Sequence, residues 1–150
     1  MWILMGLCLI LLGICTYTDL RHREVPLSLP VIFIVLAVLY RGAEGIWWQG
    51  FTELLLRLVP GVTLLLIHLL KRQWIGAGDG LLVTVCGYAL GSEMILKTVM
   101  IAFLCSGCFG LTMLILKRYD RKDTLPFVPF LLAGFLGACV FWIVREISAK

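Results

Sequence analysis

The chain has 150 residues, of which 61% are hydrophobic and 15% are charged, and its formal net charge is +4. A soluble domain usually carries about 25% charged and about 45–50% apolar residues. The composition therefore excludes an ordinary soluble domain and predicts an integral membrane protein.

The apolar runs, separated by charged or glycine-rich breaks, predict an all-α bundle of about six transmembrane helices in a single domain, residues 1–150. The predicted helices cover residues 2–18, 26–41, 51–70, 79–91, 94–117 and 126–145. A bilayer core needs about 20 residues per crossing, so the second and especially the fourth are short. We expect these two either to extend into neighbouring residues or to have one end inside protein.

The first apolar run is expected to stay in the protein as a helix. No side chain before Arg21 is positively charged, and no small-residue pattern closes the run. A cleaved signal peptide has a basic start and a small-residue cleavage site. Because this run lacks both, we interpret it as a permanent membrane helix.

Basic residues set the predicted orientation, because short loops rich in Lys and Arg stay in the cytoplasm. The breaks after the first, third and fifth helices hold Arg21, Arg23, Lys71, Arg72, Lys117, Arg118, Arg121 and Lys122. The opposite side holds Arg41, Lys97, Arg145 and Lys150. The predicted topology places both termini on the side of the membrane opposite the cytoplasm. The positive rim can meet anionic membrane lipids, and we expect no nucleic-acid binding.

The cysteines do not predict a metal site. All six fall inside predicted helices, and Cys105 and Cys108 form a C-x-x-C pair with no second pair or histidines to complete a tetrahedral site. We interpret them as small residues at helix contacts, and no metal is expected.

Two aspartates are the candidate catalytic residues. Asp19 lies where the first helix leaves the membrane on the cytoplasmic side, and Asp79 opens the fourth helix on that same side. Two close carboxyl groups that share one proton are what an aspartic hydrolase needs: one takes a proton from water and the other donates to the scissile carbonyl. From the helix dipoles, we expect Asp79 to be the base and Asp19 the acid.

Three glycines, Gly76, Gly78 and Gly80, flank Asp79. Glycine tolerates unusual dihedrals and lets another backbone come close. We expect Gly76 and Gly78 to use both properties when an extended substrate lies against the acids.

At these residues the chain resembles a known family. Gly76-Ala77-Gly78-Asp79 is similar to the G-x-G-D signature of intramembrane-type aspartic proteases, and Asp19 followed by "REVP" resembles the first catalytic aspartate of the type IV prepilin peptidases. The segment "LPFVPFLLAG", residues 125–134, resembles the family's P-F-x-P-F element, which opens a late helix. The resemblance implies that Asp19 and Asp79 cleave the leader of a prepilin or pseudopilin at the cytoplasmic face, without any cofactor.

Two positions depart from the family's pattern. Leu81 stands where a lysine is common, and Leu27 stands where an asparagine is frequent, so substrate contacts there are expected to differ. The larger family members also carry a cysteine-rich N-terminal domain associated with N-methylation. The chain has no room for such a domain, and we expect cleavage without methylation, as in the shorter members that serve Flp-type pili.

Two other functions would also place acids in the membrane. A small proton-coupled transporter could use Asp19 and Asp79 as a relay, and an inactive pilus-assembly protein could keep the fold and bind the substrate helix. The transporter leaves the glycines and the "PFVPF" segment unexplained.

The remaining charged and proline residues have structural interpretations. Glu53 and Arg57 have the spacing of an ion pair within a helix, and Pro126 and Pro129 fit the opening turn of the last helix, where a missing N–H costs little. The resemblance also places these prolines beside the active site. The other acids that could approach Asp19 and Asp79 are Glu24, Asp120 and Asp123.

Overall fold

The computed structural model describes residues 2–22, 26–43, 51–70, 76–116 and 126–148. Glu24, Asp120, Asp123 and the basic residues of the connections, apart from Arg21, lie outside this range. The described residues form six helices: α1 Trp2–His22, α2 Ser28–Ala43, α3 Phe51–Leu70, α4 Ala77–Leu90, α5 Ser92–Ile115 and α6 Val128–Ser148. The predicted all-α class and the six helices are confirmed, with helix ends that shift by a few residues.

Four of the helices, α1, α3, α5 and α6, are long and apolar enough to cross a membrane. The other two, α2 and α4, are apolar but shorter, with 16 and 14 residues. The protein is therefore a polytopic membrane protein, and the two helices predicted to be short are the short ones.

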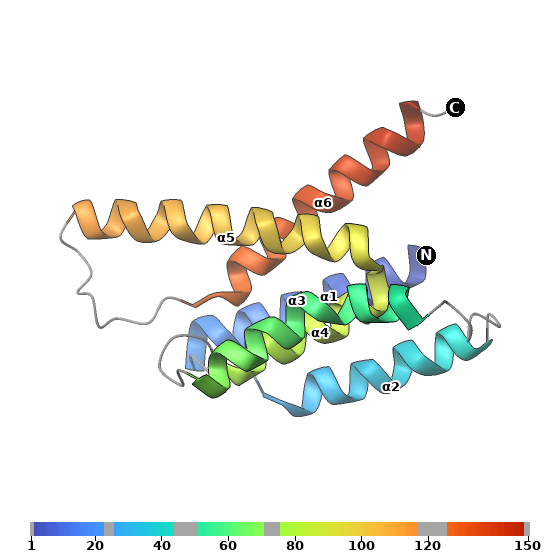
Figure 1. Ribbon diagram of the computed structural model, residues 1–150. Helices are drawn as coiled ribbons and strands as arrows, with labels where there is room; N and C mark the ends of the chain where they lie inside the picture. The colour runs from blue at the N-terminus through green and yellow to red at the C-terminus, as the bar shows by residue number, and fades with distance from the viewer. Residues whose placement is uncertain (1, 23–25, 44–50, 71–75, 117–125, 149–150) are drawn as a thin grey trace.

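Successive helices run in alternating directions, so the C-terminal ends of α1, α3 and α5 lie near the N-terminal ends of α2, α4 and α6 (Figure 1). Both termini lie toward the opposite end of the bundle. The closest pairs are α3 with α4 and α5 with α6, while α1 contacts α2, α4 and α6. Helix α4 is the most enclosed, because four other helices contact it and most of its side chains are buried.

Glycines allow these helices to pack closely. A β-carbon added to Gly61 of α3 would collide with the backbone of Thr84 in α4, and one added to Gly87 would collide with the carbonyl oxygen of Arg57. In the other pair, Gly134 of α6 lies against the carbonyl oxygen of Thr98 in α5. Small residues at such contacts are typical of membrane bundles, where close packing replaces the hydrophobic effect between helices.

Candidate active site

Asp19 is almost completely buried although it carries a carboxyl group. It lies in the last turns of α1, which continues to His22 rather than ending near residue 18, and only 6% of its surface is exposed. Its Oδ2 accepts a hydrogen bond from the backbone N–H of Val128, at an N···O distance of 3.2 Å. A buried carboxylate needs such a donor, and this one comes from a residue 109 positions away in the sequence.

The donor to Asp19 is available because of how α6 begins. The helix starts at Val128, and the carbonyl of Phe127 accepts hydrogen bonds from Phe130 and Leu131. The first N–H groups of a helix have no partner within the helix, so the N–H of Val128 is available to Asp19. Pro129 lies in the first turn, as predicted, where its missing N–H removes no bond. Pro126 lies before the helix, so its predicted place in the opening turn is wrong.

Asp79 lies in the first turn of α4, outside the four helices long enough to span the membrane. Gly76 caps this helix, and its carbonyl accepts hydrogen bonds from the N–H groups of Asp79 and Gly80. The side chain of Asp79 in turn receives a hydrogen bond from the backbone of Gly76. This is the arrangement of an acid at the third helical position whose carboxyl group reaches back toward the cap.

Burial raises the pKa of Asp79 to about 6, with a further contribution from the nearby charge of Asp19, while the hydrogen bond from Gly76 lowers it. Burial disfavours the ionised form, and a like charge close by does the same. The structure therefore brings the two predicted aspartates, which lie on α1 and α4, within electrostatic range of each other. Both lie at the end of the bundle where α1 finishes and α4 begins (Figure 1).

The glycines around Asp79 act mainly through their size. Gly76 has φ −68° and ψ 141°, which is ordinary extended backbone, and the one described glycine with positive φ is Gly91. Gly78 has helical backbone within α4, so the prediction of unusual dihedrals at Gly76 and Gly78 is wrong. A β-carbon at Gly76 would lie 3.3 Å from Oδ2 of Asp79, so glycine keeps the space beside the carboxyl group open. Gly80 is buried against Leu65 of α3, and Gly78 lies half-buried in the first turn of α4.

The two positions that depart from the resemblance lie in different surroundings. Leu27 is 54% exposed in the turn before α2, and Leu81 is half-buried, packed against the core two residues after Asp79. Among the described residues, no group of three His, Cys, Asp or Glu side chains could hold a metal ion.

Comparison with known proteins identifies the family of this chain. The sequence profile of the type IV leader peptidase family matches residues 6–115, which include both Asp19 and Asp79. The chain belongs to the type IV leader peptidase family.

One curated relative matches a longer part of this chain. The prepilin leader peptidase/N-methyltransferase of Bacillus subtilis (strain 168) is 25% identical over 134 residues, which is 87% of this chain and 52% of the relative. The chain thus spans about half the length of the curated relative it matches. No solved structure matches it.

The sequence interpretation missed the N–H of Val128 as part of the site. The available signal was the "PFVPF" segment itself, since a helix that starts there must leave its first N–H groups for an outside acceptor. Asp19 was a candidate acceptor, but its distance along the chain gave no indication that α1 and α6 meet.

Proposed function

We propose that this protein is a membrane aspartic endopeptidase that removes the leader peptide of a prepilin or pseudopilin at the cytoplasmic membrane face, without methylating the product. Its membership in the type IV leader peptidase family supports the peptidase class. The observation that carries the proposal is that Asp19 and Asp79 lie on contacting helices, α1 and α4, near enough for the charge of Asp19 to raise the pKa of Asp79. Asp19 is buried and Asp79 is partly buried, and Gly76 leaves space beside the carboxyl group of Asp79.

The proposed reaction needs one ionised and one protonated carboxyl group. The ionised group takes a proton from water as the water oxygen adds to the scissile carbonyl carbon, and the protonated group donates its proton to the carbonyl oxygen. The tetrahedral intermediate then collapses and the C–N bond breaks. The leaving amine takes the proton of the protonated carboxyl group, while one hydroxyl proton of the intermediate returns to the ionised carboxylate as the C=O bond re-forms, which restores the pair. No metal or organic cofactor takes part in these steps.

We assign the proton to Asp79 and the negative charge to Asp19. The pKa of Asp79 is raised to about 6, which favours its protonated form below that pH. Oδ2 of Asp19 accepts the N–H of Val128, a contact that favours a carboxylate. This assignment is the reverse of the one expected from the helix dipoles. The dipole contributes only about 0.3–1 kcal/mol, which is less than the about 1.5–3 kcal/mol of a hydrogen bond to a charged group, such as the one from Val128 to Asp19.

The raised pKa of Asp79 predicts a dependence of stability on pH. A folded-state pKa of about 6, against an ordinary value of 3.8, means that the folded state favours the proton more than the unfolded state does. This contribution is complete below about pH 4 and is lost as the pH rises through 6. We expect the unfolding temperature of the detergent-solubilised protein to fall over this range, and to fall less in Asp79→Asn. Parallel curves for the two proteins would contradict the raised pKa.

The N–H of Val128 can be removed with little change to the helix, because proline is favoured at the first helical position. Val128→Pro is expected to lower prepilin cleavage by about tenfold to a hundredfold, since a hydrogen bond to a charged group contributes about 1.5–3 kcal/mol. Val128→Ala keeps the N–H and is the matched control. Cleavage rates of purified variants check this, and equal rates for the two variants would show that the N–H does not matter.

The proposed function is tested by co-expressing the protein with a prepilin and measuring the mass of the pilin's N-terminus. We expect leader removal without an added methyl group. Uncleaved prepilin, in cells where the protein is correctly inserted, would overturn the proposal. If the uncleaved prepilin also co-purifies with the protein, an inactive assembly factor becomes the better description, whereas proton flux in vesicles without cleavage would indicate a transporter.

A further inference from the structure

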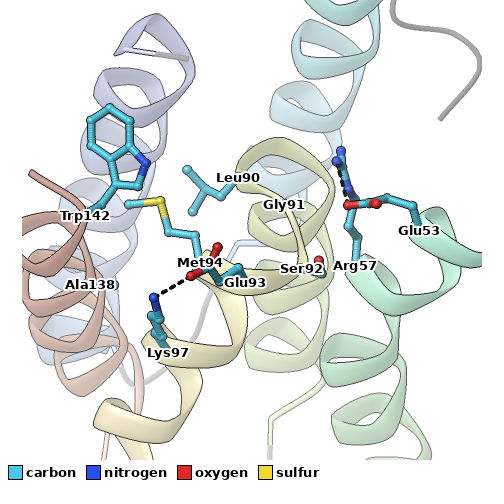
Figure 2. Close-up of a pocket in the computed structure, with 10 residues that line it drawn as sticks. All are labelled: Glu53, Arg57, Leu90, Gly91, Ser92, Glu93, Met94, Lys97, Ala138 and Trp142. Atoms are coloured by element: carbon cyan, nitrogen blue, oxygen red, sulfur yellow. Dashed lines mark hydrogen bonds and ion pairs between the residues drawn. The ribbon is translucent and has the colours of Figure 1, made fainter. Parts of the chain in front are cut away.

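A second site lies at the other end of the bundle from Asp19 and Asp79. A cavity of about 270 Å³ opens where α4 turns into α5, and residues of α3 and α6 complete its wall (Figure 2). Leu90 lines it, and Leu90 lies 11 residues after Asp79 on α4, which corresponds to roughly 17 Å along a helix. The cavity is therefore separate from the proposed active site.

Arg57 of α3 is the main polar group of this cavity. Its side chain is only 9% exposed, and one guanidinium nitrogen binds Oε1 of Glu53 at 3.2 Å, the predicted ion pair. Its Nε has no hydrogen-bond partner among the described residues although it is buried. An unpaired buried donor on a charged group is costly. The guanidinium thus retains a donor for an acceptor from outside the chain.

The carboxylates of the cavity are already bound to cations. Glu93 of α5 accepts hydrogen bonds from Lys97 at 2.8 Å and from Arg145 of α6 at 2.6 Å, so two cations share one carboxylate. The lining itself holds two cations, Arg57 and Lys97, and two anions, Glu53 and Glu93. The unpaired Nε of Arg57 is therefore the feature that favours an anionic ligand.

The remaining wall of the cavity is apolar and lies at the depth expected of a membrane interface. Met94 and Trp142 line it together with the charged residues, and the ring of Trp142 meets that of Trp2 edge-on, with centroids 5.1 Å apart. Tryptophan is enriched at the level of lipid headgroups. A phospholipid has an anionic phosphate next to an apolar glycerol and acyl part, whereas a free inorganic anion has no apolar part. A site that places a cation beside an apolar wall at this depth therefore fits a phospholipid headgroup.

We propose that this cavity binds the phosphate group of a phospholipid, with Arg57 as the main contact and Lys97 as the second. Arg57 offers its unpaired Nε–H, and the planar guanidinium can donate two parallel hydrogen bonds to phosphate oxygens. The glycerol and the first methylene groups of the lipid lie against Met94 and Trp142. This inference does not depend on the peptidase activity.

The test measures binding to the delipidated protein in detergent, from the rise in unfolding temperature with ligand concentration. The ligands are dihexanoyl-phosphatidylglycerol, dihexanoylglycerol, which lacks the phosphate, and inorganic phosphate. We expect the phosphatidylglycerol to bind most tightly. Inorganic phosphate binding equally well would overturn the lipid as ligand, and dihexanoylglycerol binding equally well would overturn recognition of the phosphate.

Variants connect the binding to the cavity. Arg57→Gln is expected to weaken phosphatidylglycerol binding at least about tenfold, since it removes a charge-assisted contact. Arg41→Gln is the matched control, because the guanidinium of Arg41 binds the carbonyl of Ala89 and lies over the ring of Tyr88, outside this cavity. If Arg57→Gln does not fold, phosphatidylglycerol binding is measured with Lys97→Gln instead, because Lys97 is partly exposed. Wild-type affinity in the folded cavity variants would overturn the site.

Discussion

Asp19→Asn and Asp79→Asn are each expected to abolish prepilin cleavage, with a loss of at least about 10²–10⁴-fold. Each variant leaves a side chain of nearly the same shape but removes one member of the acid–base pair, and positioned acid or base groups contribute factors of this size. Because the proposed mechanism has the two groups share one proton, the double variant should be no worse than either single variant. The measurement is the rate of leader removal by the purified protein.

Glu146→Gln is the matched control for these substitutions. Glu146 is an exposed acid near the end of α6, far from the end of the bundle that holds Asp19 and Asp79, so its loss should leave the rate unchanged. All three variants should insert, and near pH 4, where Asp79 is protonated in the wild type as well, they should unfold at temperatures close to that of the wild type. Cleavage that persists in either aspartate variant at more than a tenth of the wild-type rate would remove that residue from the proposed mechanism.

Gly61→Ala is expected to destabilise the protein by forcing α3 and α4 apart. The added β-carbon would meet the backbone of Thr84, which cannot rotate away as a flexible side chain can. Overpacking of this kind costs about 1–3 kcal/mol and occasionally more. Since α4 carries Asp79, the separation of α3 and α4 should also reduce cleavage. Thermal unfolding in detergent gives the size of the effect.

Gly6→Ala in α1 is the control for this substitution. A β-carbon at Gly6 has nothing within 4 Å, and alanine is the better helix former by about 1 kcal/mol. The two variants should therefore shift the unfolding temperature in opposite directions, or Gly6→Ala should leave it unchanged. Equal losses in both would mean that the contact between Gly61 and Thr84 is not a close one.

The fold could be predicted largely from the sequence because the bilayer restricts the possible structures. Apolar runs of sufficient length become helices. The basic residues between them predict which helix ends lie on the cytoplasmic side. The two short helices were recognised by length alone. What the sequence did not contain was which helices touch. The contact of α1 with α6, and hence the hydrogen bond from Val128 to Asp19, depends on packing between residues that lie far apart in the chain.

The candidate site was predicted only in part for the same reason. Asp19 and Asp79 could be placed at one end of the bundle, because each lies at a helix end on the same predicted side. The role of Gly76 could not be inferred correctly, because glycine can provide either dihedral freedom or space for a neighbouring group. The position of Oδ2 of Asp79 shows that space is the role here. The second cavity depends on a buried Nε of Arg57, whereas the spacing of Glu53 and Arg57 indicated an ordinary ion pair.

The shortness of α4 has a consequence for how the bilayer meets the protein. Its 14 residues extend roughly 21 Å, against a hydrocarbon thickness of about 30 Å. Four other helices surround α4, so its length need not match the bilayer, and a helix end below the membrane surface is tolerated where it borders protein or a water-filled space. The proposed hydrolysis consumes water, and Gly76, which is exposed at the end of α4 that carries Asp79, is a point at which solvent reaches that end.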